Sequence, residues 1–214
     1  MKLPLSFRLV APYATWMILM MALGNSNAAY AVRTLSTLAV GAVCFFAGNR
    51  SRIENFSRSL LWGLLAGVFV WLIWVLPENF EIYRKFFIVG RIDYESSSRL
   101  AESSPWVLAI RLFGSAFIIP VAEELFFRSW LYGWICQSPK DSCISKTKID
   151  LQAFLLVVVL FALEHNRWFV GAIAGIVYGL IALRVSLVSA IIAHIGTNLI
   201  LGLEVLIFNH WHFW

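Results

Sequence analysis

The sequence predicts an all-α fold: a polytopic transmembrane bundle of about seven helices, within a range of six to eight. Of the 214 residues, 60% are hydrophobic and only 14% are charged, and the mean hydropathy is +0.78. Soluble domains contain roughly 45–50% apolar and about 25% charged residues. The apolar residues also fall in uncharged runs, several of them close to the about 20 residues that a membrane-spanning helix needs.

The composition excludes several classes of protein. A soluble chain of this length lacks the interior volume to bury so many apolar side chains. The net charge is +5, but the basic residues form short clusters between apolar runs, which is typical of loops that face anionic lipid. We therefore expect the lipid bilayer as a partner and no nucleic acid. The three cysteines, Cys44, Cys136 and Cys143, contain no CxxC pair and predict neither a disulfide framework nor a thiolate metal site.

Seven segments are candidate spans. In chain order they cover residues 9–32, 34–49, 59–77, 105–135, 151–163, 168–183 and 185–203, and the second and fifth are short for a bilayer. Arg33 and Arg167 are expected in short loops on one side of the membrane, together with a longer loop from about Glu78 to Glu102. Most other Lys and Arg residues fall on the opposite side, which predicts a cytoplasmic N-terminus and an external C-terminus.

The N-terminal segment has a second interpretation. Lys2 and Arg8, followed by an apolar stretch and Ser26-Asn27-Ala28, also fit a cleavable signal peptide. The apolar run is long for such a peptide, and polytopic proteins commonly begin in this way. We therefore interpret the segment as the first span.

The fourth span has a readable start and an unusual length. Ser104 can cap it, and Pro105 suits the first helical position, where no N–H is required. From there to Ile135 the helix would be roughly 46 Å long, which exceeds the about 30 Å of the hydrocarbon core. Pro120 lies inside this span and is expected to kink it by loosening the hydrogen bond to the carbonyl of Ala116.

The most unusual feature is a pair of adjacent acids, Glu123 and Glu124, in an apolar run. An acid at the centre of a spanning helix costs on the order of 2.5–3.5 kcal/mol by insertion scales, so both carboxylates need partners. Arg128 follows Glu124 by four residues on the same helical face, which predicts an ion pair. Glu123 is rotated about 100° away from this pair. This suggests a structural role for Glu124 and a chemical role for Glu123, although the two roles could be exchanged. Alternatively, the pair simply meets water at the end of a span.

Three further polar side chains lie at a comparable apolar depth. His165 ends the fifth span, whereas His194 and Asn198 are four residues apart in the last span and face one cavity. In one interpretation, Glu123 and His165 activate a water while His194 and Asn198 donate hydrogen bonds to an oxyanion. In another, Glu123, His165 and His194 hold a zinc ion with a bound water, although no HExxH motif occurs.

These residues lie in three motifs that resemble those of the CPBP family, which comprises the CAAX proteases and bacteriocin-processing enzymes. The EExxxR motif of that family is similar to residues 123–128, its FxxxH motif to residues 161–165 and its HxxxN motif to residues 194–198. The resemblance covers about residues 105–205. Residues 165–168 also resemble a bacterial subgroup, the CAAX protease-related proteins found with exosortase sorting systems.

The resemblance implies an all-helical intramembrane endopeptidase, often of eight spans, in a membrane that we expect to be the bacterial inner membrane. Its motif residues correspond here to Glu123, Glu124, Arg128, His165, His194 and Asn198. Glu123 and His165 would activate water, and His194 and Asn198 would stabilise the oxyanion. The water would be either free of metal or bound to zinc, and the substrate would be a membrane-associated peptide or protein, in some cases lipid-modified.

We accordingly expect three parts in the chain. Residues 1–104 would form N-terminal membrane helices and a polar loop, 105–205 a catalytic helical core with the cavity between its helices, and 206–214 an aromatic C-terminal tail. The alternatives to a protease are a proton-coupled transporter, since buried Glu and His residues also mark proton paths, and a non-catalytic membrane binding or immunity protein.

Three smaller features carry expectations about packing. Gly63 and Gly67, and likewise Gly171, Gly175 and Gly179, repeat every fourth residue and predict close helix contacts. If the Gly171 face lies against the helix of His194, it sets the spacing of the catalytic helices. Glu164 adjoins His165 and could orient its imidazole. The tail, with His210 and His212, has the composition of an aromatic interface belt and a spacing that suits a metal poorly.

Overall fold

The computed structural model describes residues 3–24, 26–47, 55–88, 102–136 and 149–214, and these residues form helices and connecting segments without a β-strand. In chain order the helices are α1 (Leu5–Leu23), α2 (Asn27–Phe46), α3 (Phe56–Val75), η1 (Leu76–Asn79), α4 (Glu81–Phe87), α6 (Pro105–Phe113), η3 (Gly114–Ile118), α7 (Ile119–Glu124), η4 (Leu125–Leu131), α8 (Tyr132–Ile135), α9 (Leu151–Leu163), α10 (Trp168–Arg184), α11 (Leu187–Phe208) and η5 (Trp211–Phe213).

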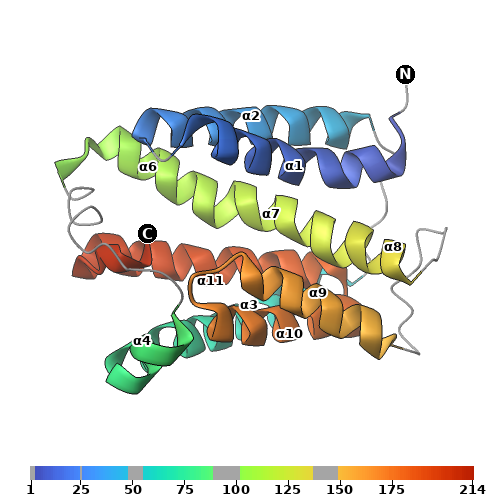
Figure 1. Cartoon of the computed structure of the whole chain (residues 1–214). Helices are drawn as coiled ribbons and strands as arrows, with labels where there is room; N and C mark the ends of the chain where they lie inside the picture. The colour runs from blue at the N-terminus through green and yellow to red at the C-terminus, as the bar shows by residue number, and fades with distance from the viewer. Residues whose placement is uncertain (1–2, 25, 48–54, 89–101, 137–148) are drawn as a thin grey trace.

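The helices form a bundle in three parts (Figure 1). The antiparallel pair α1 and α2 lies along one side, the helix from α6 to α8 crosses the middle, and α3, α9, α10 and α11 form the other side. Five helices of the described chain are long and apolar enough to cross a membrane, and α9 and α10 are shorter apolar helices. Many large apolar side chains point outward, as expected for surfaces in contact with lipid. The predicted polytopic helical bundle is confirmed.

The predicted boundary between the first two spans is wrong. The chain turns at Gly24, which has a φ of 69°, and Ser26 caps α2 by accepting a hydrogen bond from the Ala29 N–H. Arg33 therefore lies in the second turn of α2, buried, and not in a loop. Its guanidinium can remain there because it packs over the ring of Trp16, 5.2 Å from the centroid.

The middle helix spans Pro105 to Ile135 without a break, as predicted. Ser104 is its N-cap residue and Pro105 its first residue, but the Ser104 hydroxyl makes no capping hydrogen bond. Two segments, η3 and η4, have the wider π-helical hydrogen-bond pattern, and Pro120 lies in the α-helical stretch between them. Proline removes a helical N–H, and the π segments on either side are where the helix departs from regular α geometry.

The helix ends alternate as the predicted topology requires. α3, α9 and α11 end, and α6 and α10 begin, at one end of the bundle, which we call the Glu78 end (Figure 1). Glu78 itself is buried in η1 and is not part of an exposed loop, because its carboxylate pairs with Arg167. α11 continues to Phe208, past the predicted start of the tail. The side of the membrane on which the Glu78 end lies stays a prediction.

The two glycine repeats pack against different helices. A Cβ on Gly67 would lie 2.8 Å from the carbonyl oxygen of Ala193, and one on Gly63 would lie 2.7 Å from a methyl group of Ile192, so α3 approaches α11 closely. The repeat in α10 faces α9 instead, where Gly175 contacts Phe161 and Gly179 contacts Phe154. The expectation that the Gly171 face lies against the helix of His194 is therefore wrong. The contact between α3 and α11 is what places the His194 helix.

We expect Gly67→Ala to destabilise the protein by about 1–3 kcal/mol, because the added methyl group meets backbone and forces α3 and α11 apart. Thermal unfolding in detergent measures this change. Gly41→Ala is the matched control, since a Cβ on Gly41 in α2 has no neighbour within 4 Å. Equal melting temperatures for the two variants would contradict the close approach of α3 and α11.

Candidate active site

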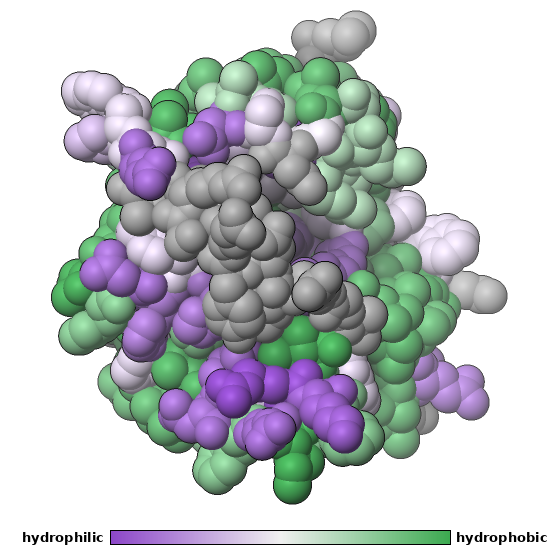
Figure 2. Space-filling model, turned by 60° about the vertical axis from the view of Figure 1, so that its left-hand side comes forward, coloured by the Kyte–Doolittle hydropathy of each residue, from purple (hydrophilic) through white to green (hydrophobic). Residues whose placement is uncertain are grey.

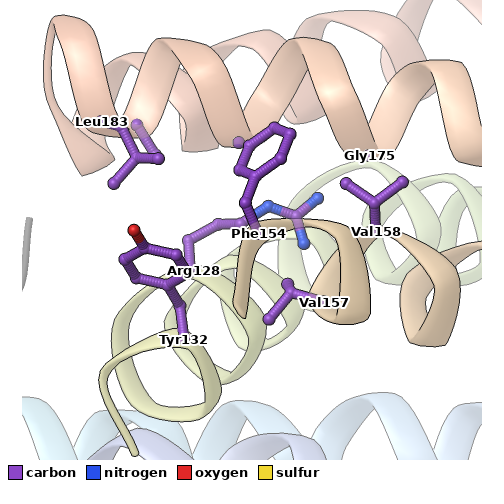
Figure 3. Close-up of a pocket in the computed structure, with 9 residues that line it drawn as sticks. Arg128, Tyr132, Phe154, Val157, Val158, Gly175 and Leu183 are labelled. Carbon is purple, nitrogen blue, oxygen red and sulfur yellow. The ribbon is translucent and has the colours of Figure 1, made fainter. Parts of the chain in front are cut away.

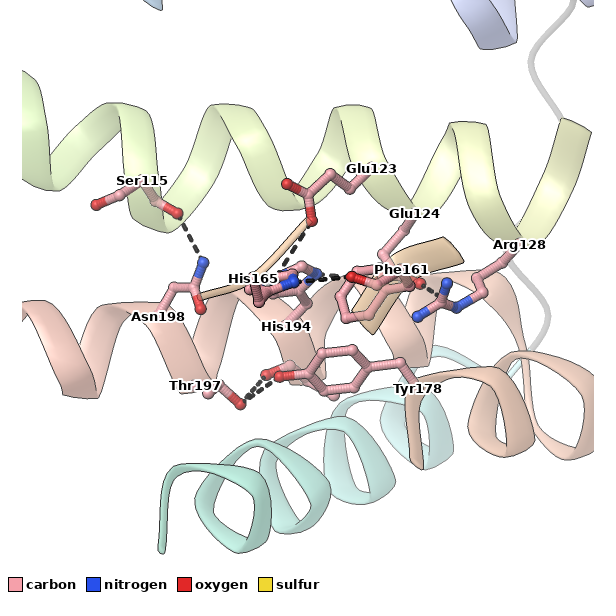
Figure 4. A network of polar contacts seen from close by, with 11 residues as sticks. Ser115, Glu123, Glu124, Arg128, Phe161, His165, Tyr178, His194, Thr197 and Asn198 are labelled. Atoms are coloured by element: carbon pink, nitrogen blue, oxygen red, sulfur yellow. Dashed lines mark hydrogen bonds and ion pairs between the residues drawn. The ribbon is translucent and has the colours of Figure 1, made fainter. Parts of the chain in front are cut away.

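A cluster of buried polar side chains occupies the middle of the bundle (Figure 4). α7 contributes Glu123 and Glu124, η4 contributes Arg128, and α11 contributes His194 and Asn198. The structure thus brings together side chains that are up to 75 residues apart in the sequence. Most other residues of these helices are apolar, so the cluster is a polar island in a membrane-spanning bundle.

The Glu124 carboxylate is the centre of this cluster. Its side chain is 0% exposed. One oxygen, Oε2, lies 3.4 Å from Nε of Arg128, and the other, Oε1, lies 3.0 Å from Nδ1 of His194. The predicted ion pair of Glu124 and Arg128 is present. In addition, Glu124 connects the middle helix to α11, which the sequence did not predict.

Arg128 is held by charge and by aromatic rings. Its guanidinium lies 4.4 Å from the centroid of the Phe161 ring, and none of its nitrogens makes a hydrogen bond within the described chain. A small cavity of about 10 Å³ adjoins it, enclosed by α9, α10 and the Tyr132 ring (Figure 3). This volume is at the lower limit for one water molecule. Since the surroundings are apolar, Glu124 is the group that compensates the charge of Arg128.

The orientation of His194 is fixed on three sides. Nδ1 faces Glu124, one ring face stacks on Tyr178 at 4.7 Å between centroids, and Phe161 meets the ring edge-on. The Tyr178 hydroxyl in turn donates to the Thr197 hydroxyl over 2.7 Å, and Thr197 donates to the carbonyl oxygen of Gly67, 2.9 Å away. The His194 imidazole is therefore fixed in position by contacts that involve α3, α10 and α11.

Glu123 faces the other nitrogen of the same imidazole. Its Oε2 lies 3.8 Å from Nε2 of His194, which is too far for a direct hydrogen bond. That oxygen has no hydrogen-bond partner in the described part of the protein. A water molecule is the usual bridge across such a polar gap. The sequence paired Glu123 with His165, whereas the structure places it next to His194.

His165 lies just beyond the end of α9. Its Nδ1 is 2.9 Å from the carbonyl oxygen of Phe161. A carbonyl oxygen only accepts, so Nδ1 carries the proton and Nε2 is left as an acceptor. Because this backbone contact orients the imidazole, the expectation that Glu164 does so is wrong for the described contacts.

A cavity of about 370 Å³ connects the cluster with the Glu78 end. The sequence-predicted residues His165, His194 and Asn198 line it. The Asn198 side chain donates from Nδ2 to the carbonyl oxygen of Ser115 in η3, 2.9 Å away, which fixes the amide at the cavity wall. The cavity is large enough for a peptide segment of a few residues, and its inner end reaches the polar cluster.

At the Glu78 end, the cavity is bordered by a set of contacting residues that the sequence did not predict to lie together. Arg167 pairs with Glu78, donates from Nη2 to the carbonyl oxygen of His212 over 3.2 Å, and packs against Phe213. Burial, together with the nearby Glu78 carboxylate, raises the pKa of Tyr83 to about 12, so this phenol stays neutral beside the pair. Figure 2, which brings the left-hand side of Figure 1 forward, shows hydrophilic side chains gathered on this end.

The C-terminal residues form part of the cavity wall, and their place at the membrane interface stays a prediction. His212, Phe213 and Trp214 all line the cavity. Glu204, on the last turns of α11, accepts a hydrogen bond from the Trp71 indole over 2.7 Å and faces Nδ1 of His210 at 3.1 Å. The signal for Glu204 was available, because it is a carboxylate in an apolar run, but the predicted span ended at Leu203.

The described residues contain no group of three or more His, Cys, Asp or Glu side chains that could hold a metal ion. Of the three predicted zinc ligands, His194 has one nitrogen on Glu124, and His165 has one nitrogen on a backbone carbonyl. Glu123 and His194 are adjacent, but no direct contact joins either of them to His165 in this part of the chain. The contacts to Glu124 and to the backbone carbonyl both use Nδ1 and leave Nε2 of each ring as the atom that could bind a metal. Zinc binding stays a prediction, and no step below depends on a metal.

The fold and the polar island define a class: a polytopic membrane protein with carboxylate, imidazole and amide groups at the inner end of a cavity. Residues 105–200 match the family model described as type II CAAX prenyl endopeptidase Rce1-like. This segment contains all three motifs, and the match supports the predicted assignment to the CPBP family of CAAX proteases. The exosortase-associated subgroup stays a prediction. No curated protein and no solved structure matches the chain.

We expect Arg128→Met to destabilise the protein by about 3–5 kcal/mol, because it leaves the buried Glu124 carboxylate without its cation. Arg184→Met, at an exposed position, is the matched control. The double variant Glu124→Gln/Arg128→Met should be more stable than Arg128→Met alone, since it removes both charges. Denaturation in detergent followed by circular dichroism measures all three, and an Arg128→Met variant as stable as the control would contradict the ion pair.

Proposed function

We propose that this protein is an intramembrane endopeptidase in which Glu123 takes the proton of a water that attacks a peptide carbonyl. The observation that carries the proposal is the 3.8 Å gap between Oε2 of Glu123 and Nε2 of His194, whose side chain lines the cavity. A carboxylate without a hydrogen-bond partner beside a fixed imidazole is suited to general-base catalysis. The family supports protease activity in general terms.

The two histidines have different parts in this proposal. Nδ1 of His194 is held by Glu124, so its Nε2 is aimed at the site, and in the protonated ring this nitrogen donates to the developing oxyanion. His165 has its Nε2 free as an acceptor and lines the same cavity, so it can accept a hydrogen bond from the attacking water. Glu124 and Arg128 position His194 and do not themselves touch the substrate.

Asn198 is the second proposed donor to the oxyanion. One of its amide hydrogens is used by the Ser115 carbonyl, and the other remains to donate into the cavity. The amide lies one helical turn beyond His194, so both donors project from the same face of α11. Removing one oxyanion donor typically lowers kcat by about 10²–10³-fold.

The substrate would be a membrane-associated peptide or protein. The cavity extends from His194 to Arg167 and the C-terminal residues at the Glu78 end, so we propose that an extended peptide enters from that end. The bundle also exposes a large apolar surface to lipid, which suits a substrate that carries a lipid group. We therefore propose a farnesylated CAAX peptide as the first substrate to assay, in the bacterial inner membrane or in proteoliposomes that replace it.

We expect Glu123→Gln to lower kcat by at least about 10²-fold with the fold intact, because the amide cannot accept the proton. The assay is cleavage of an internally quenched, farnesylated CAAX peptide by purified protein in proteoliposomes. Glu81→Gln, at an exposed position in α4, is the matched control and should retain activity. Cleavage by Glu123→Gln at the control rate would refute the role of Glu123, and no cleavage by any variant would favour a non-catalytic binding or immunity protein.

Metal dependence is the second open feature of the mechanism. The described residues contain no group of three or more side chains placed to hold a metal ion, which supports a water activated by protein groups alone. We expect cleavage to persist after exhaustive treatment with a zinc chelator, and purified active protein to contain less than one zinc per chain by elemental analysis. Activity that is lost with the chelator and restored by zinc would instead support the zinc-bound water.

A further inference from the structure

A second cluster of buried charge lies on the opposite side of the middle helix from the catalytic cavity. It is formed by Arg33 of α2 and Arg111 of α6, with the ring of Tyr30 between them. Arg33 is only 4% exposed and Arg111 is partly buried. The guanidinium carbons lie 5.5 Å and 4.7 Å from the centroid of this one ring. Two positive charges therefore share one small space between α1, α2 and α6.

No carboxylate compensates these charges in the described part of the protein. α1, α2 and α6 contain no Asp or Glu residue. The carboxylates in the ion pairs and histidine contacts of the described chain face other residues, namely Arg128, Arg167, His194 and His210. The aromatic rings of Trp16 and Tyr30 offset part of the charge, but a ring face does not replace a counter-ion for two guanidinium groups in a membrane-spanning region.

Hydrogen-bonding groups in the same place are also unused. Nε of Arg33, Nη1 of Arg111 and the hydroxyl groups of Thr34 and Thr37 are buried and have no partner in the described structure. Thr34 and Thr37 are each 1% exposed. All four groups can donate a hydrogen bond, and a buried donor without an acceptor is rare in native proteins. The missing partner is therefore an acceptor with negative charge.

We propose that this cluster, which we call the Arg33 site, binds the phosphate group of a phospholipid. A phosphate supplies several acceptor oxygens together with the missing negative charge, and guanidinium groups bind it with two parallel hydrogen bonds. Arg33 and Arg111 each lie six residues, or roughly 9 Å, from the start of their helices at the Glu78 end. This depth corresponds to the boundary between headgroups and acyl chains.

The location in the bundle favours a lipid over a peptide. α1, α2 and the first turns of the middle helix lie at the edge of the bundle, away from α3, α9 and α10 (Figure 1). Tyr30 and Arg111 are only partly buried, so a headgroup can reach them from the bilayer. The catalytic cavity does not include either arginine. The Arg33 site is therefore independent of the proposed protease activity.

The test uses the full-length protein, purified and delipidated in detergent. Phosphatidylglycerol is added, with diacylglycerol of the same acyl chains and inorganic phosphate as separate arms, and both the melting temperature and the bound mass by native mass spectrometry are measured. We expect one retained phosphatidylglycerol and a higher melting temperature with that lipid, and no effect of diacylglycerol or inorganic phosphate. Equal stabilisation by diacylglycerol or by inorganic phosphate would overturn the assignment to a lipid phosphate.

Variants locate the site. Arg33→Gln/Arg111→Gln should weaken phosphatidylglycerol binding at least tenfold, whereas the double control Arg58→Gln/Arg184→Gln, at exposed positions with the same change of charge, should bind like the wild type. If the first double variant does not fold, Arg111→Gln alone serves, since Arg111 is only partly buried, and Arg111→Lys should bind more strongly than Arg111→Gln. Unchanged binding in the variant that folds would overturn the proposal.

Discussion

The buried carboxylate of Glu124 is the contact on which the rest of the site depends. It is inaccessible to water and faces a guanidinium of its own helix on one side and an imidazole of α11 on the other. The Arg128 cation is not stable in this apolar interior without it. The same contact fixes the rotation of α11, which brings His194 to Glu123 and Asn198 to the Ser115 carbonyl. A structural ion pair and the alignment of the reacting groups are thus one feature.

Contacts with α3 and α10 stabilise this arrangement. Gly67 allows α3 to approach α11, and its carbonyl accepts the Thr197 hydroxyl, which in turn receives the Tyr178 hydroxyl. Each link is a short polar contact between apolar helices, so the imidazole has little freedom to turn. At the Glu78 end of the cavity, Arg167 pairs with Glu78 of η1 and donates a hydrogen bond to the carbonyl oxygen of His212.

The sequence predicted the helical membrane bundle, the middle helix and the ion pair of Glu124 with Arg128, because each depends on local hydrophobicity or on a spacing of four residues. It did not predict contacts between helices far apart in the chain. The link from Glu124 to His194 and the support by Tyr178 depend on helix rotation, which spacing does not encode. Arg33 was misplaced because charge alone was taken as a loop signal, whereas aromatic rings shelter it inside α2. Glu204 was missed because the last span was ended too early.

The two π-helical segments change the directions in which side chains project around the axis of the middle helix. A π segment holds one residue more than the α-helical turn that it replaces, so the residues before and after η3 are offset by about 100° relative to an unbroken α-helix. Deleting one residue from η3 would convert it to ordinary helix and turn Arg111 away from Tyr30 if Glu123 stayed in place. The extra residue thus acts as an angular spacer, which lets one continuous helix place Arg111 beside Tyr30 and Glu123 beside His194.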